Sequence, residues 1–193
     1  MREIGIVKLV QIQQSSLKAG EKPQQYYDPT PLLLVDALEI APEGVVGLTV
    51  DGGRVMDVHN QRHPESKNVG KNGVSVGFTS HYATMQQTFG DHLRDGVAGE
   101  NILVEVATRY TLADLGQKLV FKNPTTGTLA TLHGLSVAAP CEPFSRYVLQ
   151  QDEVPAAQMK TTLQALHDGI RGFYAYAAGM GTISAGDQVF VVE

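Results

Sequence analysis

Cys141 is the one cysteine in the chain, and it stands where an apolar run ends. The run Leu135–Ala139 is typical of a β-strand. Pro140 and Pro143 stop it, because proline cannot donate a backbone hydrogen bond and disfavours helical geometry in the residue before it. A thiol at a strand end can face a cleft. The other interpretation is that a lone cysteine is a small buried hydrophobe.

Reactivity at Cys141 would require the thiolate. An unperturbed thiol with a pKa of about 8.5 is only ~3% ionised at pH 7, so a nearby cation or backbone amides must stabilise the anion. Arg146 lies within one or two turns of Cys141 if Glu142–Leu149 is helical. Its other interpretation is a solvated surface arginine. Glu142, the adjacent acid, opposes ionisation of the thiol.

Histidines supply no clear metal site. His59 and His63 are four residues apart, a spacing that on a helix would aim both at one metal. Pro64 and the turn-rich context argue against a helix, and no zinc-protease motif is present. His133 lies inside an apolar strand pattern and is expected to be a core histidine.

Composition limits the function classes. The 193 residues fit one domain, and a net charge of -5 without a dense run of lysines and arginines argues against nucleic-acid binding. Acidic and basic residues interrupt Met1–Lys8, so no export signal is expected, and the apolar clusters fall short of the ~20 residues of a membrane helix. A single cysteine favours a reducing compartment. We expect a cytoplasmic protein without membrane or nucleic-acid partners.

Short strands dominate the expected secondary structure, since apolar runs of period two or of uniform character lie between turn residues. They are Ile4–Ile12, Gly44–Val50, Arg54–Val58, Val74–Phe78, Ile102–Val106, Gln117–Lys122, Gly127–Ala139, Phe173–Ala177 and Val189–Val192. Leu32–Ile40 is apolar but ambiguous in type. The polar stretch Gln13–Thr30 is expected to be a long loop.

Two segments have helical spacing. The first is expected to be capped by Thr79 or Ser80 and to stop near Gly96. Its apolar face consists of Tyr82, Met85, Phe89 and Leu93. The second is Val154–His167. The predicted fold class is therefore mainly β, an antiparallel barrel or sandwich with a few peripheral helices.

Three stretches together resemble one known family. They are the turn Gly96–Ile102, which is similar to a Gly-x-x-Gly-Glu-Asn-Leu motif, the Pro140-Cys141 pair after an apolar strand, and Arg171–Ala175 followed by Gly181 and Gly186-Asp187. Their order and spacing resemble the MOSC domain, the C-terminal domain of molybdenum cofactor sulfurases, which also occurs as a stand-alone bacterial protein. The resemblance covers roughly Gly44 to the C-terminus. We expect residues 1–193 to form a single MOSC-like domain that includes the strand and loop of residues 1–40.

The resemblance implies an antiparallel β-barrel in which Cys141 either carries sulfur as a persulfide or ligates molybdenum held by a pterin cofactor. It makes Arg171 a second candidate cation, beside Arg146. Glu100 and Asn101 either orient a ligand or serve as capping and turn residues. For both Arg171 and Arg146 the other interpretation is a solvated surface arginine without a role in binding.

Two positions depart from the family pattern. Ala138 stands three residues before the cysteine, where the family usually has an arginine, and Leu48 stands where an aspartate usually follows a Gly-x-x-Gly turn. An arginine is suited to two-point contact with a phosphate, so its loss bears on anion or pterin binding.

Three functions follow from the resemblance. The first is a sulfur carrier or sulfurtransferase that accepts sulfur on Cys141 from a cysteine desulfurase and passes it to an acceptor protein or cofactor. No pyridoxal phosphate site is evident, so that desulfurase must be a separate partner. The second is a module or oxidoreductase that binds molybdenum cofactor (molybdopterin), with Cys141 as metal ligand. The third is a non-catalytic interaction domain.

Overall fold

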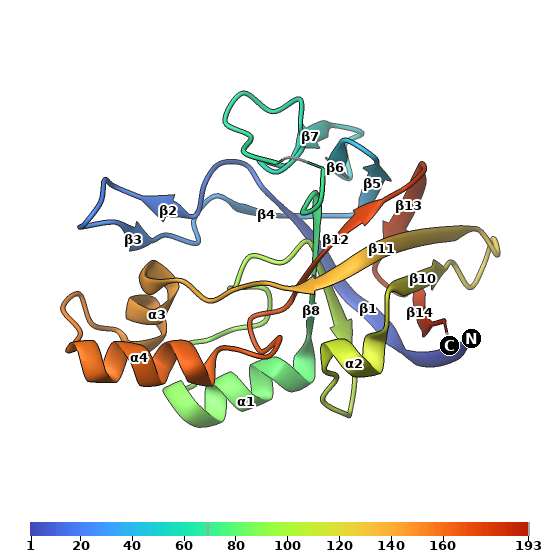
Figure 1. Cartoon of the computed structure of the whole chain (residues 1–193). Coiled ribbons are helices and arrows are strands. Elements are labelled where there is room, and N and C mark those ends of the chain that lie inside the picture. The colour runs from blue at the N-terminus through green and yellow to red at the C-terminus, as the bar shows by residue number, and fades with distance from the viewer. Residues whose placement is uncertain (69, 193) are drawn as a thin grey trace.

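The computed structural model of the chain describes residues 1–68 and 70–192 and is built around a β-barrel (Figure 1). Within these residues seven strands close in the order β14 (Gln188–Val191), β10 (Lys118–Lys122), β11 (Leu129–Val137), β12 (Phe173–Ala177), β8 (Val74–Phe78), β9 (Ile102–Glu105) and β1 (Arg2–Gln13). β1 pairs with both β9 and β14, which closes the ring. Neighbouring strands are antiparallel except β8 and β9. The predicted mainly antiparallel barrel is confirmed.

A smaller four-stranded sheet lies beside the barrel in the order β13 (Gly181–Ser184), β5 (Ala37–Ala41), β6 (Gly44–Leu48) and β7 (Arg54–Met56). β4 (Leu32–Val35) pairs with β1, so the ambiguous segment Leu32–Ile40 contains parts of two strands that belong to different sheets. β13 lies in the stretch that the sequence assigned to a Gly-rich turn. The returning strand expected over Arg54–Val58 ends at Met56.

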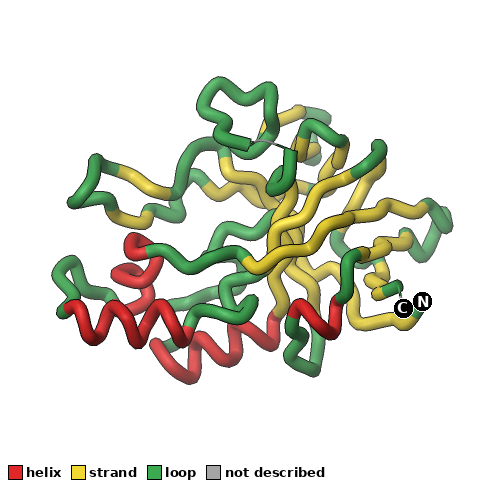
Figure 2. Tube along the Cα trace, viewed as in Figure 1, coloured by secondary structure: helices red, strands yellow, loops and turns green. Residues whose placement is uncertain are grey.

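The expected loop Gln13–Thr30 contains a short hairpin of β2 (Lys18–Ala19) and β3 (Tyr26–Tyr27). The helices are α1 (Thr79–Phe89), α2 (Leu112–Leu115), α3 (Glu142–Leu149) and α4 (Ala156–Ala165). Figure 2 shows α1, α3 and α4 gathered at one end of the barrel, and β3 packs on α3 there. No helix among the described residues is long and apolar enough to cross a membrane.

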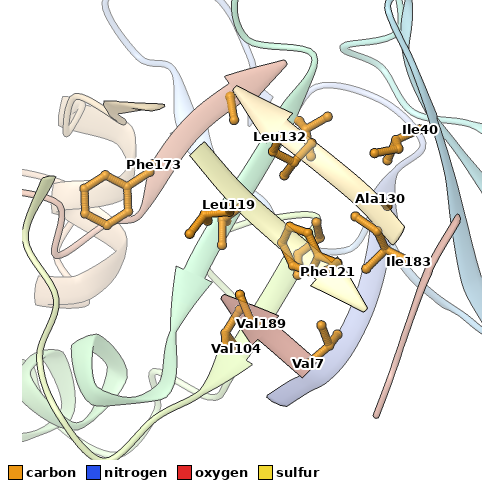
Figure 3. Packing of buried hydrophobic residues seen from close by; sticks show 14 of the residues in the cluster. Val7, Ile40, Val104, Leu119, Phe121, Ala130, Leu132, Phe173, Ile183 and Val189 are labelled. Carbon is orange, nitrogen blue, oxygen red and sulfur yellow. The ribbon is translucent and has the colours of Figure 1, made fainter. Parts of the chain in front are cut away.

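Aliphatic and aromatic side chains fill the barrel (Figure 3). Leu119, Phe121, Leu132 and Val189 are at most 1% exposed. On β11 and β14 they alternate with partly exposed residues, as period two requires, whereas on β10 the intervening Val120 is also buried. His133 points the other way: it is half-exposed and stacks on Tyr176, so the expected core histidine is wrong.

A second cluster packs the helices onto the barrel end and includes Tyr82, Met85, Leu93, Phe144 and Leu166. The apolar stripe predicted from Tyr82 to Leu93 is thus buried, although the helix that begins it ends at Phe89. Gly90 has φ of 111° and its N–H binds the Gln86 carbonyl, so a glycine terminates α1 before the expected Gly96. Phe78 occupies the N-cap position, and the Thr79 hydroxyl instead bonds the Val106 backbone.

Candidate functional site

A pocket of about 510 Å³ opens where the barrel meets the β2–β3 hairpin. We call it the barrel pocket. Strands β1, β8 and β12, the turn before β9 and the segment after β7 contribute to its wall. Its ionisable lining residues are Lys18, Tyr27, His59, Glu65, Lys67, Glu100, Arg171 and Tyr174. Within the described residues neither Lys18 nor Lys67 forms an ion pair, and the lining contains three lysine or arginine side chains against two glutamates.

Glu100 is 3% exposed and forms part of the pocket wall. Its Oε2 accepts a hydrogen bond of 2.9 Å from the Tyr82 hydroxyl, which itself accepts one from the Ala98 N–H. Its Oε1 has no partner among the described residues. Burial raises the pKa of Glu100 to about 7. A Cβ on Gly77 would come within 2.8 Å of Oε1, so the carboxyl group needs glycine at that position of β8.

Asn101, the next residue, points away from the pocket into the protein. Its Oδ1 accepts hydrogen bonds from the backbone N–H and hydroxyl of Ser75, and its Nδ2 donates to the Gln11 carbonyl and to Asp57 Oδ2. The side chain is 1% exposed. Glu100 and Asn101, paired as candidates in the sequence, therefore occupy different environments, and only Glu100 lines the barrel pocket.

Arg171 lies just before β12 and lines the pocket. Its Nη1 donates a 3.3 Å hydrogen bond to the Ala139 carbonyl, its guanidinium lies 5.2 Å from the centre of the Phe144 ring, and its buried Nε has no partner among the described residues. Burial lowers the pKa of Arg171, but the ionisable groups that face it, Cys141, Tyr174 and Tyr27, outweigh burial and leave that pKa raised. Arg171 is thus a partly buried cation with one donor free.

Cys141 is half-buried and forms the N-cap of α3. Its carbonyl accepts the first hydrogen bond of the helix, from the Ser145 N–H, and no side-chain cap occupies this end. Cys141 packs against the second apolar cluster, the one that contains Phe144. Its thiol interacts electrostatically with Arg171 and Tyr27, both of which line the barrel pocket. Arg171 Nη1 donates to the Ala139 carbonyl, two residues before Cys141, so Cys141 lies near Arg171, although Cys141 itself is not among the residues that line the barrel pocket.

Arg146 serves a different part of the molecule. The condition set in the sequence, a helix over Glu142–Leu149, is met by α3, and Arg146 forms an i,i+4 ion pair with Glu142 at 3.3 Å. Its Nη1 donates to the Gln25 carbonyl at 3.1 Å. It does not line the barrel pocket. Of the two candidate cations, the structure brings Arg171 to the pocket and uses Arg146 to tie the β2–β3 hairpin to α3.

The β2–β3 hairpin covers one side of the pocket. Leu17 and Tyr27 are buried, and the Tyr27 hydroxyl donates a 2.7 Å hydrogen bond to the Val97 carbonyl. The Tyr27 ring packs edge-on against Phe144, with ring centres 4.9 Å apart, and against Tyr147. The long polar loop of the sequence is therefore an ordered wall of the site, held by an aromatic contact to α3.

The two departures from the family pattern fall in different places. Ala138 is 4% exposed and lines the pocket, so the position where the family usually carries an arginine presents a methyl group to it. Leu48 lies at the end of β6, in the smaller sheet, and pairs with Ala37 and Arg54 away from the pocket. Only the loss at Ala138 bears on what the pocket can bind.

A pair of residues that the sequence did not single out together also reaches the pocket. His59 lines it, and buried Asp57 accepts a 2.9 Å hydrogen bond at Oδ1 from His59 Nδ1. The signal that could have found them is an aspartate at the start of a turn, since an Asp side chain commonly bonds the backbone N–H two residues on, as Asp57 does with His59. His63 does not line this pocket. Within the described residues, no cluster of three histidine, cysteine, aspartate or glutamate side chains could hold a metal.

Solved structures with a similar fold support the architecture. The YuaD protein from Bacillus subtilis matches with a TM-score of 0.56 and 13% identity, covering 96% of this chain and 93% of that one. YiiM from Geobacillus stearothermophilus matches with a TM-score of 0.50 and 16% identity, covering 100% and 75%. YiiM from Escherichia coli gives a TM-score of 0.50 and 16% identity, covering 83% and 65%. A comparison with curated proteins returned no match.

The family model of the MOSC domain matches residues 69–190, which is more than half of the chain and contains all three motifs of the predicted resemblance. The match begins later than the Gly44 expected from those motifs. Because the matched segment includes the turn before β9, Cys141 and the closing strands, the chain belongs to the MOSC domain family.

Proposed function

We propose that the protein is a sulfur carrier that holds sulfane sulfur as a persulfide on Cys141. The observation that carries the proposal is the position of the thiol: Cys141 occupies the N-cap position of α3 and lies near Arg171, a cation that lines the barrel pocket. A persulfide anion there would be stabilised by the guanidinium and by the backbone N–H groups of Glu142 and Phe144 at the helix start, where Pro143 supplies none. The Nε of Arg171 has no acceptor within residues 1–68 and 70–192 and is available as a donor.

Loading would proceed by sulfane transfer from a separate cysteine desulfurase. The Cys141 thiolate attacks the outer sulfur of the donor's cysteine persulfide, forming a new S–S bond. The donor's S–S bond breaks, and its electron pair stays on the donor cysteine, which leaves as a thiolate and takes up a proton from water. No oxidant is needed, because the transferred sulfur keeps its oxidation state. In the second transfer the acceptor attacks the outer sulfur of the Cys141 persulfide, and Cys141 leaves as a thiolate.

The test is incubation of the purified chain with a pyridoxal phosphate cysteine desulfurase and cysteine, followed by mass spectrometry. The expected result is a gain of one sulfur atom on the peptide containing Cys141, removed by a reducing thiol. Cys141→Ser is the matched control and should gain none. Wild-type protein that stays unmodified under conditions that load an authentic acceptor would contradict the proposal.

A second function, binding of molybdenum cofactor, is favoured by the polar atoms of the barrel pocket. Among the described residues Glu100 Oε1 and Arg171 Nε are buried without a partner, and Lys18 and Lys67 add positive charge. Such a wall fits an anionic pterin with N–H groups, although Ala138 leaves one family cation absent. Arg171, Lys18 and Lys67 would hold the anionic groups, Glu100 would accept from an N–H, and Cys141 would supply the thiolate ligand. Bound there, the cofactor would supply two-electron redox chemistry.

Elemental analysis separates the two functions. Protein produced in a host rich in molybdenum cofactor should contain no molybdenum if the sulfur carrier is right. About one molybdenum per chain that is lost in Cys141→Ser would favour the second function.

A further inference from the structure

The loop after β7 places a histidine in the wall of the barrel pocket with one ring nitrogen fixed. Asp57 is fully buried. Its Oδ1 accepts two hydrogen bonds from His59, one from ring Nδ1 at 2.9 Å and one from the backbone N–H at 2.8 Å. The His59 side chain is 29% exposed and lines the pocket. One side of the imidazole is thus held inside the protein and the other is open to the pocket.

The hydrogen bonds around Asp57 determine which nitrogen carries the proton. Its Oδ2 accepts the Gln13 backbone N–H and Asn101 Nδ2, each at 2.8 Å, so both carboxylate oxygens face donors. A carboxylate surrounded by donors requires Nδ1 of His59 to donate as well. Nε2 is then the free nitrogen, an acceptor that can take a proton from a group in the pocket.

Asn101 links this pair to the turn that carries Glu100. Its Oδ1 accepts hydrogen bonds from Ser75. Its Nδ2 donates to Asp57 Oδ2, the carboxylate oxygen that His59 does not contact. Two consecutive turn residues therefore act on the same pocket by different routes. Glu100 lines it directly, whereas Asn101 acts on it through Asp57 and His59.

We propose that His59 is the proton acceptor for the group that takes sulfur from the Cys141 persulfide, and that Asp57 and Asn101 are its positioning residues. The inference rests on the proposed function and adds an acceptor class, a nucleophile that carries an ionisable proton, such as a thiol. The acceptor sulfur bonds to the outer persulfide sulfur, and its proton moves to His59 Nε2. The S–S bond breaks, and its electron pair stays on Cys141 beside Arg171.

The experiment starts from protein loaded chemically with sodium polysulfide, so it does not depend on a desulfurase partner. Release of sulfur from Cys141 is followed with two probes, 2-mercaptoethanol and sulfite. The thiol must lose a proton as it attacks, whereas sulfite at mildly alkaline pH is a dianion with no proton to lose. His59→Gln should slow transfer to the thiol by about 100-fold, the lower end of general-base effects, and leave transfer to sulfite nearly unchanged.

His63→Gln is the matched control, because His63 lies in the same loop but outside the pocket. It should behave as wild type with both probes. Equal slowing of both probes by His59→Gln would mean a structural role only, and an unchanged thiol rate would remove His59 from the reaction; either result overturns the inference. Failure of the wild-type chain to load at all would instead overturn the proposed function, and the inference with it.

A spectroscopic measurement tests the positioning residues. Nitrogen chemical shifts should show His59 of the wild-type chain protonated at Nδ1 and bare at Nε2. Asp57→Asn, and more weakly Asn101→Ala, should shift the tautomer toward Nε2–H and slow only the transfer to the thiol. Because both variants alter a buried network, their folding is checked by thermal unfolding. Wild-type His59 found protonated at Nε2 alone would contradict the assignment even if neither variant folds.

Discussion

Buried polar atoms are treated differently in the barrel interior and at the end of the barrel where α1, α3 and the barrel pocket lie, which we call the pocket end. The barrel is filled by apolar side chains such as Phe121 and Leu132. Buried side-chain atoms without a partner, within residues 1–68 and 70–192, belong to Ser80, His81, His92, Glu100, Ser145 and Arg171. None of these residues is in a barrel strand; they lie in α1, α3 and adjacent loops. An unpartnered buried polar atom costs free energy, so the barrel supplies the stability that the pocket end uses.

A large truncation in the barrel should produce the largest effect on stability. Phe121 is 1% exposed in β10, and Phe121→Ala should lower the free energy of unfolding by about 3–5 kcal/mol, because it removes buried surface and leaves a cavity. Urea denaturation measures it. Val50→Ala, at a side chain 92% exposed, is the control and should change little. If Phe121→Ala lowered the free energy of unfolding as little as Val50→Ala does, the barrel would not be the more stable of the two regions.

Glu100 should make the pocket end less stable as pH rises. Burial raises its pKa from 4.5 to about 7, so the folded chain binds more protons than the unfolded chain between these values. Stability from this group is therefore full below about pH 4.5 and declines as pH rises to about 7, by about 3 kcal/mol in all. Glu100→Gln should remove this decline in urea titrations at several pH values. An identical pH dependence in the variant would contradict the burial argument.

The hairpin wall should be weaker than the barrel. Tyr27→Phe removes the hydrogen bond to the Val97 carbonyl and should cost about 1–2 kcal/mol, since a buried acceptor loses its partner. Amide hydrogen exchange of residues 18–27 should become faster, whereas exchange in β10 and β11 should not. The neighbouring Tyr26→Phe is a matched control, because Tyr26 is 54% exposed. Equal effects of the two variants would show that Tyr27 does not hold the hairpin.

The smallest stability effect is expected at Arg146, whose ion pair with the exposed Glu142 and hydrogen bond to the Gln25 carbonyl together contribute about 1 kcal/mol. Arg146→Gln should leave sulfur loading of Cys141 unchanged. Arg171→Gln should slow loading by at least about tenfold, because it removes the cation beside the thiol. Desulfurase loading followed by mass spectrometry compares the two variants. A greater loss with Arg146→Gln would reverse their assignment.

The barrel could be predicted from the sequence because its strands follow local rules. Val74–Phe78 and Phe173–Ala177 were predicted with the bounds that the structure has, since alternation and turn residues mark both ends. β2, β3 and α2 were not predicted. Each is two to four residues long and depends on tertiary partners that leave no periodic pattern.

The site was only partly predictable for the same reason. The motifs identified Cys141, Glu100 and Arg171, but sequence spacing could not separate Arg171 from Arg146. It also gave no indication that Asn101 reaches Asp57, 44 residues away. Contacts of this kind are set by how the barrel closes and not by neighbours in the chain.

Whether Cys141 carries sulfur or binds molybdenum is decided by two measurements on one sample. Intact-mass spectrometry and molybdenum analysis are made on the same sample, wild type and Cys141→Ser, purified without reductant from cells that produce molybdenum cofactor. The account predicts a reducible extra sulfur on wild-type Cys141, none on Cys141→Ser, and no molybdenum in either. Stoichiometric molybdenum that depends on Cys141, without any sulfur adduct, would contradict it.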